Sequence, residues 1–491
     1  MATKATKSAA APKAKSSAKG KTRVEKDLLG PLEIPVDALY GVQTARGLQN
    51  FKISNIPMNK YPNFIKGFAY TKWGAAIANH KLGLVNDEQK AAIVQACKEI
   101  IDGQHHEFFT SDMIQGGAGT TMNMNANEVI ANRALQIMGH KPGEYKYCDS
   151  HDHVNCSQST NDAYPTAMHF GLYFSHKDMI EALELLVKAL DKKGTEFAKI
   201  LKMGRTQLQD AVPMTLGQTF KGFAAGLKRE VKALNAAAEE FLTVNMGATA
   251  IGTGICSEPG YSDLCVKALS DIMKLKIKLD DNLVFVTSDN GAVVNYSAGL
   301  KRLAIRLGKI CNDLRLMGSG PRCGLQEIHL PAMQPGSSIM PGKVNPVIPE
   351  VVNQVCFRVI GNDFVVAMAA DAAQLELNVM EPVMCYSVFE SIDLLKNAFN
   401  TLRTLCIDGI KANKKRCAQL VHNSIGVVTA LNPYIGYDNS TELAKEALEN
   451  DKSVIDLILE KKILTKEQLD TIMAPENLVK PVKLDIKPAK K

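Results

Sequence analysis

The chain has 491 residues, enough for a large apolar core and for two to four domains or one extended fold of several parts. Hydrophobic residues make up 46% and charged residues 22% of it, a composition typical of an ordinary soluble protein. No stretch approaches the roughly 20 uninterrupted apolar residues that a membrane-spanning helix needs, so no membrane partner is expected. Eleven cysteines without a Cys-x-x-Cys pair argue against a disulfide framework or a structural zinc site, and they favour a reducing compartment.

The formal net charge of +7 comes from the beginning of the chain. Residues 1–24 carry seven lysine and arginine side chains and no acidic one, so the rest of the chain is close to neutral. Because this segment has almost no large apolar side chain, we expect a disordered basic tail, and a second one over residues 479–491. The alternatives for the first tail are a peptide that targets a mitochondrion or another organelle, and weak binding to nucleic acid or an anionic surface. The body of the chain predicts a cytoplasmic protein.

Residues 25–160 mix short apolar pieces with turn-rich stretches such as Gln115-Gly116-Gly117-Ala118-Gly119-Thr120, and we expect an N-terminal domain there. Two polar clusters fall in or next to this region. They are Gly119-Thr120-Thr121-Met122-Asn123-Met124-Asn125 and Ser157-Gln158-Ser159-Thr160-Asn161-Asp162. Each by itself is also typical of a helix cap or a loop, because Ser, Thr, Asn and Asp favour such places. His151-Asp152-His153 lacks further ligands at a suitable spacing, so no metal is predicted.

Residues 161–412 change to the pattern of long helices. Leu300, Leu303, Leu307, Ile310 and Leu314 recur at spacings of three and four, which places one apolar stripe on a helical face. Similar runs cover 166–201, 220–234, 346–373 and 382–411. Most of these runs predict helices of about 25 residues, roughly 40 Å long, whose stripes can be buried only against partners of similar length. The sequence therefore predicts a central bundle of long helices.

A third polar cluster, Gly204-Arg205-Thr206-Gln207-Leu208-Gln209-Asp210, interrupts the long runs. No glycine-rich nucleotide motif accompanies it, because Gly252-Thr253-Gly254 lacks the third glycine and the strand context. Beyond the bundle, residues 413–478 predict a small C-terminal helical domain. Within it, Thr465-Lys466-Glu467-Gln468 has the pattern of a capping box before a short helix.

The most informative stretch is Gly336-Ser337-Ser338-Ile339-Met340-Pro341-Gly342-Lys343-Val344-Asn345, directly before one of the long runs. A serine can abstract a proton from carbon only if nearby N–H donors and positive charge stabilise its alkoxide. The Gly-Ser-Ser turn offers successive backbone N–H groups, and Lys343 offers the charge. Asn345 adds an uncharged donor and acceptor for a substrate carboxylate.

This stretch resembles the signature of the fumarase/aspartase superfamily, Gly-Ser-x-x-Met-Pro-x-Lys-x-Asn. The three polar clusters match the superfamily's site regions in order and approximate spacing, and the resemblance covers residues 25–475. Within the superfamily the chain is most similar to the ammonia-lyases that act on aspartate. Three stretches carry that similarity: 203–210, 375–382 and 423–426. The resemblance implies a mainly α, three-part subunit with a central long-helix bundle, and a homotetramer that shares one multi-helix core and builds each site from three chains.

The reaction implied by the resemblance is the reversible anti-elimination of ammonia from L-aspartate to give fumarate, through an aci-carboxylate and without a cofactor. Ser337 would be the general base, on a mobile loop that closes over the substrate. The β-carboxylate would be held by Thr120, Ser159, Thr160 and Ser338, and the α-carboxylate by Lys343 and Asn345. Asn161, Thr206 and Gln207 would lie near the amino group.

Two alternatives remain. The first is fumarate hydratase, which shares the fold and acts on malate and fumarate. Gln207 argues against it, because glutamine removes a titratable group that a hydratase would use; fumarases, and some aspartases, carry a histidine at that position. The Asp149, His151 and Asp152 pattern also departs from the fumarases' secondary anion pocket. The second is a non-catalytic scaffold whose lysine tail binds nucleic acid or an anionic surface, although every matched polar position is intact.

Overall fold

The protein is described by a computed structural model that covers residues 21–486, and contacts between residues divide it into two units. The first unit holds the residues up to Met168 together with Val244–Thr287, and the second holds His169–Thr243 together with the residues from Ser288 on. Helices dominate both units, which confirms the mainly α prediction. The division into three domains stays a prediction. Residues 1–20 and 487–491 of the two predicted tails lie outside the described residues. Thr22–Val24 belong to a strand, and Leu484 and Ile486 pack against the apolar core of the C-terminal helices.

The first unit is a set of helices preceded by a β-hairpin. Its strands and main helices are β1 (Thr22–Asp27), β2 (Gly30–Pro35), α1 (Val42–Asn50), α2 (Pro62–Lys81), α3 (Asp87–Ile101), α4 (Thr120–Ile137), α7 (Tyr261–Met273) and β6 (Lys278–Leu279). A π-helical turn covers Ser150–Val154, and short 3₁₀ turns cover Met58–Lys60 and His106–Phe108. Local signals set several boundaries, since Pro62 begins α2 and a capping box of Asn86 and Gln89 begins α3.

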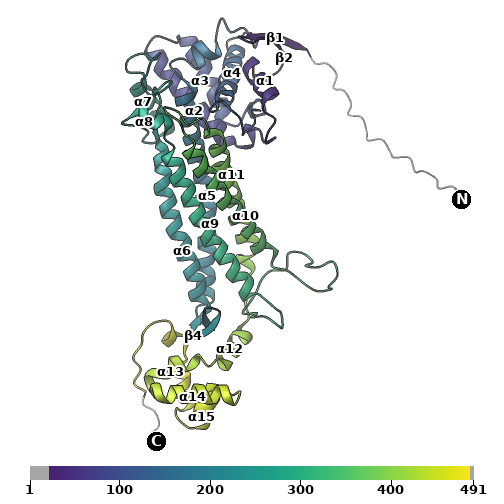
Figure 1. The fold of residues 1–491 in the computed structure, drawn as a ribbon, viewed down its shortest axis with the longest axis vertical. Coiled ribbons are helices and arrows are strands. Elements are labelled where there is room, and N and C mark those ends of the chain that lie inside the picture. Colours follow the sequence, from purple (N-terminus) through teal and green to yellow (C-terminus); the bar gives the residue numbers. More distant parts are fainter. Residues whose placement is uncertain (1–20, 487–491) are drawn as a thin grey trace, which may run out of the picture. The chain divides into compact units, whose positions relative to one another are not determined.

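The second unit consists of long helices and a group of short C-terminal ones (Figure 1). Its strands and long helices are α5 (Thr160–Glu196, of which the first residues belong to the first unit), β3 (Leu201–Thr206), β4 (Gln209–Thr215), α6 (Leu216–Ala238), α9 (Gly291–Met317), β7 (Ile328–His329), α10 (Val347–Asp371), α11 (Glu381–Leu405) and β8 (Lys411–Ala412). The junction between the units contains β5 (Thr243–Val244) and α8 (Leu283–Ser288), and 3₁₀ turns cover Glu239–Leu242 and Ile407–Gly409.

The predicted apolar stripes form the core of the bundle. All five stripe residues of α9, from Leu300 to Leu314, are at most 4% exposed. They lie where α9 packs on α6 and α10, and α10 in turn packs on α11. A buried polar contact joins three helices: the ring nitrogens of His176 on α5 lie 2.9 Å from the Tyr296 hydroxyl of α9 and from Asn235 Oδ1 of α6. The long-helix bundle predicted from periodicity is therefore present.

Helix α10 differs from its neighbours in its exposed face. Among residues 21–486 it is long and apolar enough, by length and composition alone, to cross a membrane. It packs along α9 and α11, as a core helix of a bundle does. Its other face exposes Phe357, Phe364 and Met368, with 60–67% of each side chain accessible. Together with Gly361 these residues follow a 4-3-4 spacing, which is the seam of a helix that packs against another helix.

The C-terminal part of the second unit has its own apolar core. Its helices are α12 (Lys414–Asn423), α13 (Val427–Ile435), α14 (Tyr437–Glu449), α15 (Val454–Glu460), α16 (Lys466–Ile472) and α17 (Pro475–Leu478). The predicted capping box begins α16, where Thr465 and Gln468 bond reciprocally to each other's backbone N–H. Met203 of β3 belongs to the same buried cluster as Val427, Leu431 and Leu457, so the β3–β4 hairpin is rooted in this core.

Candidate active site

The N-terminus of α4 presents Thr120, the first of the predicted site residues. Gly119 precedes it with a φ of 86°, in the left-handed region that favours glycine. A Cβ at Gly119 would lie 2.3 Å from the ring of Tyr164 on α5, so only glycine permits the two helices to approach this closely. Thr120 is exposed, and its hydroxyl donates to the Gly117 carbonyl at 2.7 Å. The first turn of α4 is therefore held against the first turns of α5.

The beginning of α5 carries Ser159, Thr160 and Asn161, all partly exposed. Ser159 Oγ accepts a hydrogen bond from Asn161 N at 3.2 Å, as a capping residue does. The Asn161 amide donates to the Ala250 carbonyl at 2.8 Å, which ties the helix start to the loop before α7. The same loop bonds to Asp162, whose Oδ2 accepts from Gly247 N at 3.1 Å and Thr249 N at 3.0 Å. Asp162 is fully buried, and its burial raises the pKa of the carboxyl to about 7.

A buried lysine contacts the polar residues next to these helix starts. Lys72 of α2 is fully buried, and its Nζ lies 2.8 Å from Asn123 Oδ1, 3.0 Å from Asn155 Oδ1 and 2.9 Å from Gln158 Oε1. Burial lowers the pKa of this ammonium to about 7. Donating to three oxygens requires the protonated form, so the three contacts oppose the effect of burial. Asn123 Nδ2 donates onward to Thr160 Oγ1 at 3.2 Å, which connects the lysine to a predicted site residue.

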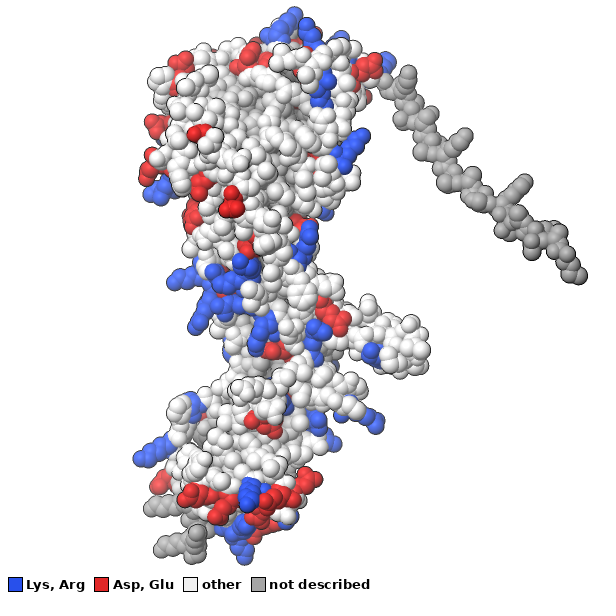
Figure 2. Space-filling view, in the orientation of Figure 1, with Lys and Arg blue, Asp and Glu red and all other residues white. Residues whose placement is uncertain are grey.

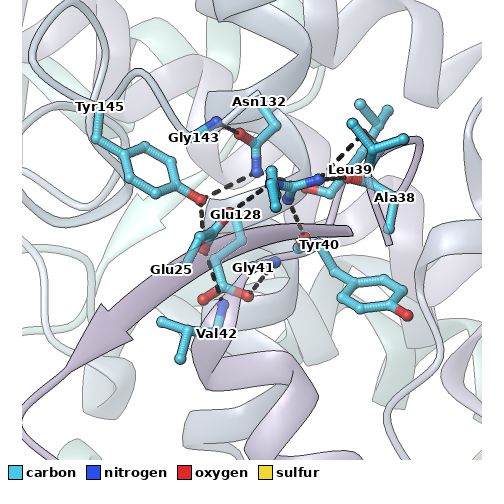
Figure 3. Close-up of polar contacts among 12 residues, drawn as sticks. Glu25, Ala38, Leu39, Tyr40, Gly41, Val42, Glu128, Asn132, Gly143 and Tyr145 are labelled. Atoms are coloured by element: carbon cyan, nitrogen blue, oxygen red, sulfur yellow. Dashed lines mark hydrogen bonds and ion pairs between the residues drawn. The ribbon is translucent and has the colours of Figure 1, made fainter. Parts of the chain in front are cut away.

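A second buried acid anchors α4 from its middle. Glu128 of α4 accepts hydrogen bonds from Gly41 N, Gln43 N and the Thr44 hydroxyl at 2.6–2.9 Å, at the N-terminus of α1. Glu25 of β1 accepts from Val42 N at 3.0 Å and from the Tyr145 hydroxyl at 3.0 Å (Figure 3). Two carboxylates thus cap one helix start, where unpaired N–H groups favour negative charge. Burial nevertheless raises the pKa of the Glu128 carboxyl to about 7.

In the second unit, Thr206 and Gln207 lie at the exposed tip of the β3–β4 hairpin. The hairpin pairs Thr206 with Gln209, so Gln207 and Leu208 form a two-residue turn. A cavity of about 790 Å³ lies beside it, between α6 and α9. Gln207, Arg205, Phe223, Arg306 and Lys309 are among the residues that line this cavity. The tip thus borders a space with both apolar and cationic walls.

The loop 336–345 projects from the second unit between β7 and α10 (Figure 1). Its two ends are held together because Gly336 N donates to the Lys343 carbonyl at 2.7 Å and the Asn345 amide donates to the Gly336 carbonyl at 2.5 Å. Gly336 is required here, since a Cβ would lie 2.5 Å from that same Lys343 oxygen. Figure 2 shows the projection as largely uncharged, and Lys343 is the one lysine or arginine of the loop.

The Ser337 hydroxyl has two backbone N–H donors close to it. Its Oγ accepts hydrogen bonds from Met340 N at 2.9 Å and from Ile339 N at 3.2 Å. The sequence predicted backbone donors from the Gly-Ser-Ser turn, whereas these donors come from the two residues that follow it. Two N–H groups aimed at one hydroxyl oxygen stabilise negative charge on that oxygen. Lys343 and Ser338 are exposed in the same loop.

The predicted residues therefore fall on three chain regions. The structure brings Thr120, Ser159, Thr160 and Asn161 together in the first unit. Thr206 and Gln207 lie on the hairpin, and Ser337, Ser338, Lys343 and Asn345 lie in the projecting loop. The sequence did not point to Lys72 or Asn155, and Gln158 stood in the second polar cluster without an assigned role. A lysine inside the apolar run of α2 was the available signal for the first of them.

The described residues 21–486 contain no group of three or more His, Cys, Asp or Glu side chains that could hold a metal ion.

A family described as Lyase matches residues 30–361, and one described as Fumarase C C-terminus matches residues 427–480. The chain therefore belongs to the lyase family of the fumarase/aspartase type.

Individual relatives have more specific names than the two families. An aspartate ammonia-lyase from Pseudomonas aeruginosa is 56% identical over 461 residues, covering 94% of this chain and 97% of the relative. One from Escherichia coli (strain K12) is 52% identical over 460 residues, covering 94% and 96%. A solved fumarate lyase:delta crystallin from Brucella melitensis, bound to cobalt, superposes with a TM-score of 0.91 at 48% identity, covering 94% and 100%. A class II fumarase from Schistosoma mansoni has a TM-score of 0.86 at 33% identity over the same shares.

Proposed function

We propose that the chain catalyses the reversible elimination of ammonia from L-aspartate to give fumarate. The observation that carries this assignment is identity above 50%, over nearly the whole of both chains, to aspartate ammonia-lyases. The similarity to a class II fumarase is lower, at 33% identity. A glutamine at position 207 is also consistent with an ammonia-lyase, because a hydratase of this superfamily would use a histidine there.

Ser337 is the proposed general base. Its alkoxide takes the proton from the β-carbon of aspartate, and the electron pair moves into the β-carboxylate to form a dianionic aci-carboxylate. That pair then forms the double bond of fumarate while the C–N bond breaks and its electrons leave with ammonia. The two N–H groups of Ile339 and Met340 support this role, because they are already aimed at the serine oxygen.

The remaining polar groups are proposed to hold the substrate. Thr120, Ser159, Thr160 and Ser338 bind the β-carboxylate, where negative charge increases during the reaction. The buried Lys72 adds positive charge behind Thr160 through Asn123. Lys343 and Asn345 bind the α-carboxylate. Asn161, Thr206 and Gln207 face the amino group.

We propose further that the enzyme is a homotetramer whose sites each combine three chains. The exposed seam of α10, Phe357, Gly361, Phe364 and Met368, supports this arrangement, since a bundle helix with a second apolar stripe has room for another helix. Each large side chain that becomes buried contributes about 1.5–3 kcal/mol. Association would bring residues of different copies to one site, which accounts for site residues distributed over three chain regions.

We propose that the protein works in a reducing compartment such as the cytoplasm. All eleven cysteines are free thiols, and eight of them are buried. The proposed reaction uses no residue of the N-terminal tail, so the tail is not expected to contribute to turnover. Deleting residues 1–20 is expected to leave turnover of L-aspartate within about twofold, and a larger loss would give the tail a catalytic function.

The test of the function is direct. The purified protein is incubated with L-aspartate and, separately, with L-malate, and fumarate is followed by its ultraviolet absorbance. We expect fumarate from L-aspartate only. Fumarate from malate alone would instead establish a hydratase, and no product from either substrate would favour the non-catalytic scaffold.

The role of Ser337 is tested by Ser337→Ala. The variant should keep its oligomeric state and thermal midpoint, because the side chain is partly exposed and bonds only within its loop. Turnover should fall by about a thousandfold or more, since the variant lacks the oxygen that is proposed to take the proton. Ser319→Ala, in the loop after α9, is the matched control and should retain turnover. Rates within about threefold of wild type for Ser337→Ala would remove the serine from the base role.

A further inference from the structure

The turn that presents Gln207 has an unusual backbone. Gln207 and Leu208 have φ values of 55° and 63°, the combination of a type I′ hairpin turn. Glycine and asparagine favour this conformation, whereas glutamine and leucine rarely adopt it. A turn of this kind persists only where its surroundings hold it. Thr206 and Gln209 flank the turn, and the next pair along the two strands is Arg205 and Asp210.

Arg205 holds the first strand. Its Nη1 lies 2.7 Å from Glu327 Oε1, and Glu327 is fully buried. The other oxygen of this carboxylate lies 2.9 Å from Lys202 Nζ. The backbone of Glu327 is fixed as well, because its N–H donates to the Met317 carbonyl and its carbonyl accepts from Asn413 N. Arg205 is therefore bound to a rigid point between α9 and α12.

Asp210 holds the second strand. Its Oδ2 accepts a hydrogen bond of 2.7 Å from the hydroxyl of Ser424, a residue 214 positions away. Ser424 Oγ accepts in turn from Gly426 N at 3.1 Å. A Cβ at Gly426 would lie 2.5 Å from the Ala211 carbonyl, so the segment after α12 runs directly against β4. The Asn423-Ser424-Ile425-Gly426 stretch thus holds β4 in place, although none of its residues takes part in the proposed reaction.

The root and the tip of the hairpin differ in their environment. Met203 is fully buried in the core of the C-terminal helices, whereas every residue from Thr206 to Asp210 is exposed. The Glu327 and Ser424 contacts act at the boundary between these two parts, one on each strand. Because both strands are held next to the turn, the tip cannot rotate or slide without breaking a charge-assisted hydrogen bond.

We propose that Ser424 and Glu327 are positioning residues that hold the Arg205–Asp210 segment so that Thr206 and Gln207 meet the amino group of the substrate. The inference rests on the proposed function and extends it to residues that do not touch the substrate. Since they act through Gln207, their loss should weaken recognition of the amino group and of ammonia. Recognition of the two carboxylates, which depends on other chain regions, should stay unchanged.

The experiment compares Ser424→Ala with Ser453→Ala. Ser453 is a matched control in the same helical part, whose hydroxyl bonds to the His422 carbonyl and to Ile455 N. Kinetics are measured in the direction of amination, with ammonium and fumarate varied separately. For Ser424→Ala we expect the KM for ammonium to rise by about fivefold or more while the KM for fumarate stays within about twofold. Ser453→Ala should match wild type in both constants.

A second pair of variants covers the case in which Ser424→Ala does not fold, as judged by its thermal midpoint and oligomeric state. Asp210→Ala removes the acceptor and should give the same selective rise in the KM for ammonium. Asp210→Asn keeps an oxygen for Ser424, so its KM for ammonium should rise less. Unchanged constants in Ser424→Ala and Asp210→Ala would overturn the proposal. Equal increases of the KM values for ammonium and fumarate would also overturn it, because they would indicate a general loosening of the site. Wild-type turnover of L-aspartate reports on the proposed function separately.

Discussion

Lys72 and Asn123 lie 2.8 Å apart from Nζ to Oδ1, and both are buried within the first unit. The same asparagine donates to Thr160, so one amide connects a buried ammonium to a residue of the candidate site. The contact joins α2 to α4, and Asn155 and Gln158 complete the lysine's set of acceptors. This arrangement makes the lysine both a structural element and a source of positive charge.

Replacing this lysine should affect stability and turnover together. Lys72→Met leaves two amide oxygens, those of Asn123 and Gln158, without the donor they have in the fold, and each buried unpaired group costs about 1–3 kcal/mol. We expect a loss of about 3 kcal/mol or more in unfolding free energy and a turnover at least tenfold lower, as Thr160 loses its fixed position. Differential scanning calorimetry and the fumarate assay measure the two effects. Lys81→Met, at the exposed end of the same helix, should change neither, and a stable, fully active Lys72→Met would contradict the assignment.

The close approach of α4 to α5 predicts different effects at two neighbouring glycines. Gly117 and Gly119 both have positive φ, so alanine at either position should cost about 1–2 kcal/mol in backbone strain. At Gly119 the added Cβ also meets the Tyr164 ring at 2.3 Å, whereas at Gly117 the nearest atom is 3.9 Å away. Gly119→Ala should therefore lower the unfolding free energy by about 3 kcal/mol or more and displace Thr120. Equal thermal midpoints for the two variants would show that the approach is not tight.

The buried Glu128 carboxyl predicts a pH dependence of stability. Because burial raises its pKa to about 7, the fold binds a proton here that the unfolded chain releases near pH 4.5. This contribution to stability is fully present below about pH 4.5 and is lost as pH rises through about 7. Asp162, raised to about 7 as well, acts in the same direction. Lys72, whose pKa is lowered to about 7, acts in the opposite direction above pH 7, so the thermal midpoint should fall mainly between pH 5 and pH 7.

Glu128→Gln isolates one part of this effect. The amide does not titrate, so the variant should show a smaller fall between pH 5 and pH 8 than wild type. Its NH₂ group also faces N–H donors at the start of α1, which should cost about 2–4 kcal/mol at every pH. Glu88→Gln, on the surface of α3, removes a charge without burial and serves as the control. An unchanged pH slope in Glu128→Gln would assign the dependence to other groups.

The exposed seam of α10 predicts the effect of a charge at its centre. Phe364→Lys places an ammonium where the proposed tetramer buries an aromatic ring, so the assembly should dissociate to smaller species. Light scattering measures the mass, and turnover should fall with it because each site needs several chains. Leu448→Lys on α14 changes an equally exposed apolar side chain outside the seam and should leave both unchanged. An active tetrameric Phe364→Lys would exclude this face from the interface.

Local sequence patterns predicted much of the fold. The stripe from Leu300 to Leu314 predicted a buried helix face, and the Thr465–Gln468 pattern predicted a capping box, both of which the structure contains. The Ser337 loop was also recognisable, because its serine, lysine and asparagine lie within ten positions of one another. These features involve neighbours in the chain, and periodicity and caps depend on neighbours alone.

The sequence by itself determined the helical periodicity, the caps and the residues of the reactive loop. Only the tertiary structure decided which acceptors surround Lys72, because these acceptors lie 51, 83 and 86 positions away in the chain. It also decided that Ser424 bonds to Asp210 across 214 positions. It also decided that the N–H donors to Ser337 are those of Ile339 and Met340. The physical reason is that a contact between distant residues depends on how whole helices pack. The spacing of residues along the chain does not determine that packing.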